Sequence, residues 1–477
     1  MAGDRLTGLD ASFLHLEDAS SHMHVAGVML FEGPPPPYDE LLEVFERRLP
    51  LVPRYRQRLA FVPLGQGRPR WVDDPHLNLR YHVRSTALPS PGSEKQLQDL
   101  AGRVFSQQLD RDKPLWEVWL VEGLEGDRFA MLSKTHHALV DGISGVDIMS
   151  VLFDSSKEPL TPTGPGDRWL PRPMPSRAQL LGEALLERAT IPTEVVRSVR
   201  AVFRGPRRIL EAAREAAVGV GAMAWAGLNP APPSPYNKPI GPHRRFAWVR
   251  ASLRDIKAIK DSLGGTVNDV VLATVAGALG RHLRRRGHNT DGLELKVMVP
   301  VSVRQDLERG ALGNKVAAIM APLPVWCQEP IARLDIVREE LKHLKSGGQA
   351  VGAQVLTDLS GFAPSTIMDQ ASRLMSRQRF FNLVVTNVPG PQFPLYLLGR
   401  RMLDPFPMVP LAKNQGLGVA LLSYDGAINF GVVGDFDLMW DLDELADDVR
   451  ASLEELADVA GVRLTVQRPG FSAPVEA

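Results

Sequence analysis

Residues 129–142 read Phe-Ala-Met-Leu-Ser-Lys-Thr-His-His-Ala-Leu-Val-Asp-Gly, a strand-like stretch that runs into a histidine pair and then Asp141-Gly142. The β-favouring residues at 129–135 predict a strand, and the apolar spacing at 142–153 predicts a helix after it. The histidines are therefore expected in a loop at the end of a sheet, where α/β proteins often place reactive groups. Because neighbouring strand residues point to opposite faces, one histidine can face a cavity while the other packs behind it.

The chemistry that one cavity-facing histidine can supply is general-base catalysis. An alcohol attacks poorly until its proton is removed, and neutral imidazole, with a pKa of about 6.5, accepts a proton near neutral pH. Asp141 can orient the imidazole or pair with an arginine, and Gly142 allows a sharp turn into the helix. Two successive strand residues rarely bind one ion, and the chain has neither a His-Glu-x-x-His pattern nor a cysteine cluster, so we expect no metal.

The composition indicates a two-domain globular protein. The 477 residues exceed the roughly 250–300 that one core usually accommodates. Lys+Arg and Asp+Glu both total 55, a balance that argues against a nucleic-acid-binding protein. The single cysteine, Cys327, excludes an internal disulfide and fits the cytoplasm, and we see no signal peptide. The apolar run at 216–228 is shorter than the about 20 residues that a membrane span needs.

Two proline-rich stretches, 159–175 and 230–242, divide the chain. Prolines at this density break helices and strands and form stiff linkers. The domains that we expect are an N-terminal domain at 1–158, a helical linker at 159–245 and a C-terminal domain at 246–477. The linker block at 177–228 combines arginines with apolar residues, so it is either an interdomain helix with a solvated charged face or a segment that lies on an anionic bilayer.

Helix caps stand out in the second half. Thr266 and Asp269 form a capping-box pattern that predicts a helix start, and Gly287 after a run of arginines predicts its end. A last helix is predicted to begin at Asp441, with Glu444 completing its cap. Strands are predicted at 24–31, 116–121, 129–135, 295–303 and 382–386, with a hairpin turn at Asp425-Gly426.

Residues 136–142 resemble the HHxxxDG motif of the CoA-dependent acyltransferase superfamily, which includes chloramphenicol acetyltransferase and the condensation domains of peptide synthetases. Further segments resemble, in the same order along the chain, the bacterial wax ester synthase/acyl-CoA:diacylglycerol acyltransferase family. These segments are Leu9-Asp10-Ala11-Ser12-Phe13, Met23-His24-Val25, Pro114-Leu115-Trp116, 268–273, 299–304, Gly313-Asn314 and 387–391. Ala317 departs from the family pattern, which has a serine after the Gly-Asn.

The resemblance implies an α/β (α+β) fold of two chloramphenicol-acetyltransferase-like domains with an active-site tunnel between them. His137 would be the general base, with His136, Asp141 and Gly142 supporting it. Asn268 and Asp269 would lie at a helix N-terminus facing the tunnel, where they bind substrate or merely cap the helix.

Two further sites carry open alternatives. Arg304 pairs with Asp141 across the domain boundary or is an ordinary surface arginine. The tryptophan in the segment 114–116 packs a core or helps to shape the tunnel.

The implied activity is the transfer of a long-chain acyl group from acyl-CoA to the hydroxyl of diacylglycerol or a fatty alcohol, that is, triacylglycerol or wax ester synthesis. Acyl-CoA would be a co-substrate, with no resident cofactor. The protein would be cytoplasmic and peripherally associated with the inner membrane or lipid droplets. Two alternatives stay open: a superfamily relative that acylates a polyketide or sugar alcohol, and a catalytically silent lipid-surface protein.

Overall fold

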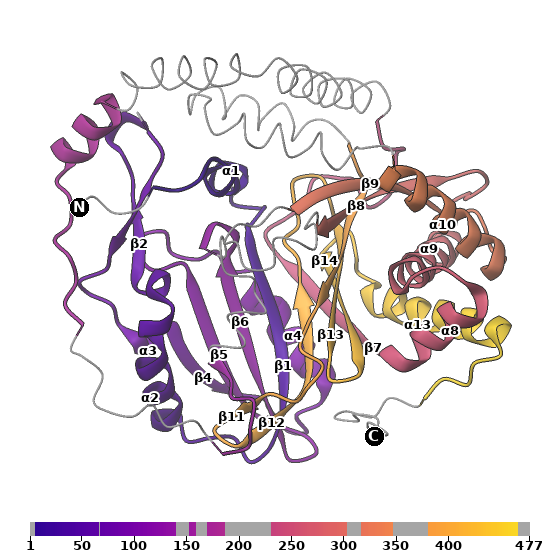
Figure 1. Ribbon diagram of the computed structural model, residues 1–477, viewed down its shortest axis with the longest axis horizontal. Coiled ribbons are helices and arrows are strands. Elements are labelled where there is room, and N and C mark those ends of the chain that lie inside the picture. The colour runs from indigo at the N-terminus through magenta and orange to yellow at the C-terminus, as the bar shows by residue number, and fades with distance from the viewer. Residues whose placement is uncertain are drawn as a thin grey trace, which may run out of the picture.

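Two six-stranded sheets form the centre of the molecule, each with helices packed against it (Figure 1). The computed structural model describes residues 5–65, 67–139, 152–158, 169–186, 230–302, 316–346 and 380–465. The first sheet has the strand order β11-β12-β1-β6-β5-β4, and the second has the order β7-β14-β13-β10-β8-β9. Each sheet is combined with helices that pack against it, so the α/β (α+β) class expected from the sequence is confirmed.

The first sheet consists of β1 (His24–Glu32), β4 (Val83–Ala87), β5 (Trp116–Leu124), β6 (Arg128–His136), β11 (Tyr396–Leu397) and β12 (Arg400–Met408). The helices around it are α1 (Gly8–Leu16), α2 (Tyr38–Arg48), α3 (Leu79–His82) and α4 (Glu94–Phe105), and short 3-10 turns are η1 (Leu49–Leu51), η2 (Pro53–Arg56), η3 (Pro63–Gly65) and η4 (His137–Leu139). A separate hairpin pairs β2 (Gln57–Ala60) with β3 (Arg70–Asp73).

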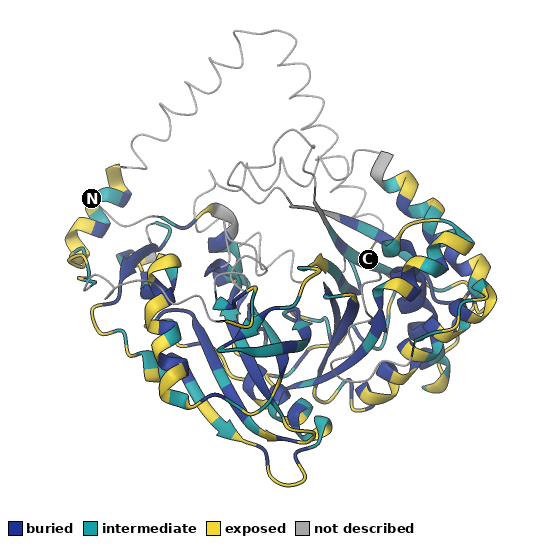
Figure 2. Ribbon diagram, turned by 60° about the horizontal axis from the view of Figure 1, so that its bottom comes forward, coloured by how far each residue is buried: buried dark blue, intermediate teal, exposed yellow. Residues whose placement is uncertain are grey.

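The second sheet consists of β7 (Arg244–Ser252), β8 (Glu294–Ser302), β9 (Val316–Pro324), β10 (Leu383–Pro389), β13 (Leu417–Tyr424) and β14 (Ala427–Asp435). Its helices are α8 (Leu253–Leu263), α9 (Val267–Arg285), α10 (Pro330–Ser346) and α13 (Leu442–Ala460). Helix α9 is buried along most of its length and packs between α13 and α10. Figure 2 shows the strands buried and the outward faces of these helices exposed.

The chain crosses back between the sheets late in its course. Strand β12 pairs antiparallel with β1, with Ala26 opposite Met408, so residues 396–408 complete the first sheet. Stacking of Trp248 on Phe406, with ring centroids 4.7 Å apart, joins β7 to this crossover. Buried apolar residues of both halves of the chain therefore pack in one cluster, which includes Val28, Trp248 and Phe406.

Two local predictions are confirmed in detail. At the start of α9, the Asp269 backbone N–H donates to Thr266 Oγ1 over 3.3 Å, and the Thr266 N–H donates to the Asp269 carboxylate over 2.7 Å. The turn between β13 and β14 has positive φ at both Asp425 (43°) and Gly426 (80°), as a two-residue hairpin turn requires.

The predicted cap of the last helix is wrong, although the helix does begin directly after Asp441. The Asp441 side chain makes no capping hydrogen bond. Instead, its carboxylate pairs with Arg286 over 2.8 Å and with His282 over 3.1 Å, and Glu444 pairs with Arg285 over 2.8 Å. Cations at the end of α9 thus occupy the carboxylates that the pattern assigned to the cap.

Candidate active site

The histidine pair lies where strand β6 ends and the turn η4 begins. The His136 backbone N–H donates to Leu115 O over 2.9 Å, and the His137 N–H donates to Met23 O over 2.8 Å. His136 is 1% exposed, whereas the side chain of His137 is half-buried. The two side chains therefore differ in burial, whereas their divergence to opposite faces stays a prediction.

The buried imidazole of His136 is hydrogen-bonded at Nδ1, while its Nε2 faces a carboxylate without a hydrogen bond to any described residue. Its Nδ1 accepts the Ala138 backbone N–H over 3.1 Å. Because Nδ1 is an acceptor here, the neutral ring carries its proton on Nε2. That nitrogen lies 3.5 Å from Glu17 Oε2.

Glu17 is a carboxylate that the sequence patterns did not single out. Its side chain is 1% exposed, and Arg111 Nε donates to Oε2 over 2.9 Å. Burial alone would raise the pKa of Glu17, but hydrogen bonds and charge from His136 and Arg111 outweigh burial and lower it to about 2. Glu17 is therefore ionised at neutral pH. No local signal marks it, because Arg111 and His136 lie 94 and 119 residues further along the chain.

Helix α1 contacts both histidines. The ring of Phe13 stacks on His137, with centroids 3.9 Å apart and planes 25° apart. Glu17 directly follows the last residue of α1, four residues after Phe13, so both side chains lie on one side of the helix. The sequence marked Phe13 as a family landmark without indicating this contact.

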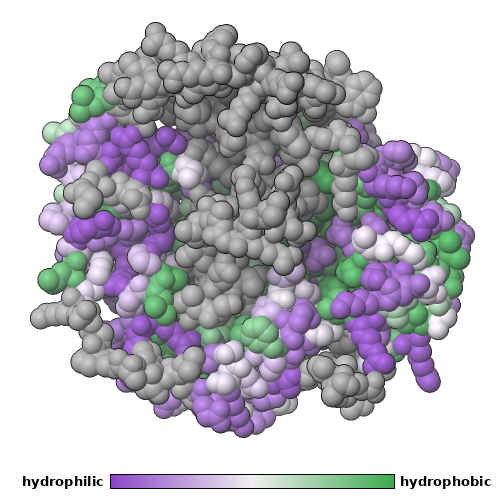
Figure 3. All heavy atoms as spheres, viewed as in Figure 1, coloured by the Kyte–Doolittle hydropathy of each residue, from purple (hydrophilic) through white to green (hydrophobic). Residues whose placement is uncertain are grey.

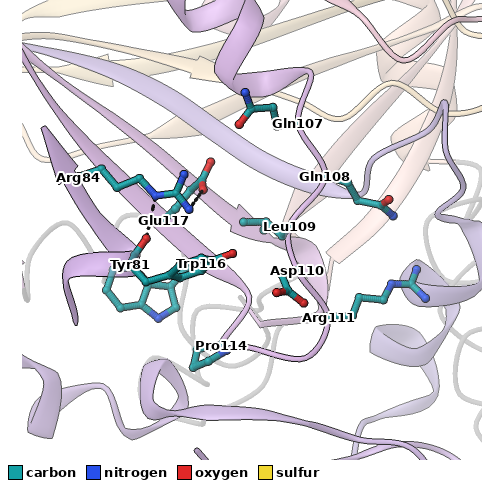
Figure 4. Close-up of a pocket in the computed structure, with 10 residues that line it drawn as sticks. All are labelled: Tyr81, Arg84, Gln107, Gln108, Leu109, Asp110, Arg111, Pro114, Trp116 and Glu117. Atoms are coloured by element: carbon teal, nitrogen blue, oxygen red, sulfur yellow. Dashed lines mark hydrogen bonds and ion pairs between the residues drawn. The ribbon is translucent and has the colours of Figure 1, made fainter. Parts of the chain in front are cut away.

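A cavity of about 510 Å³ opens beside the segment that precedes β5 (Figure 4). Its lining residues are Tyr81, Arg84, Gln107, Gln108, Leu109, Asp110, Arg111, Pro114, Trp116 and Glu117. Pro114 and Trp116 thus face a cavity, while Leu115 is fully buried. Trp116 is 1% exposed and its Nε1 donates to Tyr55 O over 2.8 Å, so its predicted place in a core is confirmed.

One wall of this cavity contains buried charged side chains. Glu117 Oε1 lies 2.6 Å from Lys134 Nζ, and Arg84 approaches the same carboxylate at 3.5 Å, as the dashed line in Figure 4 marks. Lys134 also donates to Gln107 O over 2.7 Å. Burial lowers the pKa of Lys134 despite the attraction of Glu117. This wall of the cavity is therefore polar and internally paired.

The loop between α1 and β1, next to the histidines, is held by the second half of the chain. Ser21 Oγ donates to Leu411 O over 2.9 Å, and Lys413 Nζ lies 3.3 Å from Asp18. Arg244, at the start of β7, donates to Ser20 O. The histidine pair therefore lies beside the junction of the two halves.

Of the remaining predicted site residues, Asn268 and Asp269 lie in the described part of the chain, at the start of α9. Asp269 is 4% exposed and its carboxylate is engaged in the helix cap, whereas Asn268 is half-buried in the first turn of α9. A role for Asn268 in substrate binding stays a prediction. Asp141, Gly142 and Arg304 lie outside the described residues, as do Gly313 and Asn314.

Two further observations concern metals and membranes. Within the described ranges, no group of three or more His, Cys, Asp or Glu side chains is placed to hold a metal ion. No single helix among the same residues has the length and apolar character of a membrane span. Only α8 and α9 together, with a 95° bend between them, pass that test, and α9 is a core helix of the second sheet.

Comparison with known proteins gives consistent matches over both halves. The wax ester synthase/diacylglycerol acyltransferase catalytic domain matches residues 6–271, and the C-terminal domain of the same description matches residues 312–457. A Mycobacterium tuberculosis protein named as a diacylglycerol O-acyltransferase is 34% identical over 471 residues, with 98% of each chain covered. A Mycobacterium bovis protein named in the same way is 34% identical over the same length.

Solved structures agree with these matches. A wax ester synthase/diacylglycerol acyltransferase from Marinobacter aquaeolei VT8 is 28% identical, with a TM-score of 0.68, over 96% of this chain and 100% of that chain. The first condensation domain of the calcium-dependent antibiotic synthetase is 15% identical, with a TM-score of 0.59, over 98% and 100% of the two chains. The second likeness shows a shared fold, and it confirms the two-domain architecture that the histidine motif implied.

Proposed function

Because the chain belongs to the wax ester synthase/diacylglycerol acyltransferase family, we propose that it moves a long-chain fatty acyl group from acyl-CoA to the hydroxyl of diacylglycerol. The observation that carries this proposal is the unequal burial of the histidine pair at the end of β6, where His136 is buried and His137 is partly exposed. The family membership favours this activity over acylation of a polyketide or a sugar alcohol.

The reaction needs one base and no acyl-enzyme. His137 takes the proton of the acceptor hydroxyl while that oxygen attacks the thioester carbonyl carbon. The new C–O ester bond forms, the C–S bond breaks, and the CoA thiolate leaves and takes the proton back from the imidazolium. Such general-base help is typically worth about 10²–10⁴ in rate. Acyl-CoA enters as a co-substrate, and the scheme uses no resident cofactor.

A fatty alcohol is the second candidate acceptor. The family description names wax ester synthases, and so does the name of the Marinobacter structure. Diacylglycerol is the first choice because the Mycobacterium relatives, which cover 98% of this chain, are named for that acceptor.

We also propose that the protein works peripherally, on the cytoplasmic face of the inner membrane or on lipid droplets, where its apolar acceptor is dissolved. The β2–β3 hairpin and residues 169–186 form one corner of the molecule, held together by contacts such as the bond that Arg172 Nε donates to Asp73 Oδ2 over 3.1 Å. Large exposed apolar side chains at this corner are Phe61, Leu64, Leu170, Met174, Leu185 and Leu186. Half-buried or exposed arginines in the same segments are Arg58, Arg68, Arg172 and Arg177. Figure 3 shows hydrophilic and hydrophobic side chains side by side at the upper left, where residues 177–186 lie in Figure 1.

Apolar side chains beside arginines are the surface chemistry that binds anionic lipid. Of the block at 177–228 that the sequence singled out, residues 177–186 belong to this corner, and the rest lies outside the described residues.

An acceptor panel tests the proposed activity. One long-chain acyl-CoA is offered with diacylglycerol, a fatty alcohol, a sugar and a hydroxylated polyketide, and products are identified by mass spectrometry. We expect triacylglycerol as the main product, with wax ester as the second, and neither from His137→Ala. Acylated sugar or polyketide without neutral lipid would overturn the proposal, and no product with any acceptor would favour the silent lipid-surface protein.

A further inference from the structure

A buried carboxylate next to the histidine pair has no place yet in the proposed chemistry. The Glu17 side chain is 1% exposed, and its Oε1 has no hydrogen-bond partner among the described residues. A charge removed from water in this way is costly unless charged partners compensate for it. Glu17 has one charged partner, the Arg111 guanidinium, and its Oε2 also faces Nε2 of the His136 imidazole at 3.5 Å.

These partners form a chain of contacts that leads to the proposed base. Arg111 binds Glu17 and also donates to Leu14 O over 3.0 Å, so it fixes the end of helix α1. Glu17 faces Nε2 of His136, whose Nδ1 accepts the Ala138 N–H. Ala138 belongs to the turn η4, which begins with His137. A change at Glu17 is thereby connected to the backbone that carries His137.

We propose that Glu17 is a positioning residue for acyl transfer, acting through His136 on the turn that presents His137. The inference rests on the proposed role of His137 as the general base. The carboxylate keeps the His136 proton on Nε2, and this leaves Nδ1 free to accept the Ala138 N–H. Glu17 is not assigned any contact with the substrates.

The opposite tautomer shows why the carboxylate matters. With its proton on Nδ1, His136 would point a donor at the Ala138 N–H, which is also a donor, and the turn would lose its bond. Phe13, one helical turn before Glu17, stacks on His137 from the same helix. The end of helix α1 therefore holds the His136 ring through the Glu17 carboxylate and the His137 ring through stacking on Phe13.

The expected effect is a loss of kcat with little change in KM. A shift of about 1 Å in a reacting group can cost about 10²-fold in rate, while substrate contacts elsewhere are kept. We expect Glu17→Ala to lower kcat by about 10²-fold and to leave the KM for acyl-CoA within about twofold. Glu17→Gln should recover part of kcat, because its amide oxygen can accept a hydrogen bond from the Nε2–H of His136.

Asp154→Asn is the matched control. Asp154 is another buried carboxylate, 4% exposed, and among the described residues it pairs with Arg48 and with neither histidine. Its loss should lower thermal stability and leave kcat per folded enzyme unchanged. Equal kcat losses in Asp154→Asn and Glu17→Gln would mean that any buried charge in this half matters equally, and would overturn the inference.

A double-mutant cycle decides between positioning and general stabilisation. If Glu17 acts through His136, Glu17→Gln should cost no further kcat in a His136→Ala background. Full additivity of the two losses in kcat would overturn the inference. If Glu17→Ala fails to fold, Glu17→Gln decides alone, and a normal kcat in that folded enzyme would also overturn the inference. His137→Ala, measured in parallel, separates the two claims. An inactive His137→Ala beside fully active Glu17 variants rejects only the inference, whereas an active His137→Ala rejects the proposed function.

Discussion

Replacing His136 by alanine should destabilise the protein far more than replacing its neighbour His137. His136 is 1% exposed, and its Nδ1 is the acceptor for the Ala138 N–H. His136→Ala leaves that buried donor unpaired, which costs about 1–3 kcal/mol, and removes one of the two cationic or donor partners of Glu17. His137→Ala removes mainly a ring stack on Phe13, worth about 0.5–1.5 kcal/mol.

The assay is denaturant unfolding of the unsubstituted protein, His136→Ala and His137→Ala, monitored by intrinsic fluorescence. Steady-state kinetics are measured on the same proteins. His136→Asn is the matched variant, because its side-chain oxygen can take the place of Nδ1 and accept the Ala138 N–H. We expect His136→Asn to regain a clear part of the lost stability. If His136→Ala is no less stable than His137→Ala, the assignment of His136 as the support behind the turn is wrong.

Four further variants have expected outcomes that follow from the described contacts. Asn268→Ala should lower turnover more than stability, whereas Asp269→Ala should cost about 0.5–2 kcal/mol of stability because it removes the capping box, as thermal unfolding and kinetics will show. Leu185→Ser with Leu186→Ser should reduce flotation with anionic vesicles, and added salt should reduce it further. The pKa of Glu17 is about 2 in the folded protein and 4.5 in the unfolded chain. Its contribution to stability is therefore present above pH 4.5 and is lost as the pH falls toward 2. Glu17→Gln should flatten this acid limb, the loss of stability below pH 4.5, in a pH series of unfolding experiments.

Turnover of Asn268→Ala that falls only in step with its folded fraction would return Asn268 to a purely structural role. For flotation the control is Val459→Ser, an exposed apolar residue near the end of α13, and equal losses in both proteins would remove the lipid-binding role of the corner. An unchanged acid limb in Glu17→Gln would show that other carboxylates dominate acid unfolding.

Local signals in the sequence predicted local structure well. The capping box of α9 and the Asp425-Gly426 turn each depend on residues within four positions of one another, and both are present as predicted. The strand that ends at His136 was also predicted, because its residue pattern needs no knowledge of distant partners.

Long-range contacts explain what the sequence did not show. The cap at Asp441 failed because Arg286, 155 residues earlier in the chain, binds that carboxylate. Strand β12 joins the first sheet although it follows most of the second, and no local pattern encodes such a crossover. Glu17 was missed for the same reason, since its role depends on Arg111 and on a histidine in another element.

The general-base role of His137 is tested most directly by steady-state kinetics of His137→Ala, with thiol release from a long-chain acyl-CoA and diacylglycerol as acceptor. Because the ring is half-buried and the backbone N–H bond to Met23 O does not need it, the variant should stay folded. We predict a fall in kcat of about 10²–10⁴ with KM little changed. A folded His137→Ala enzyme with near-normal turnover would contradict the central claim.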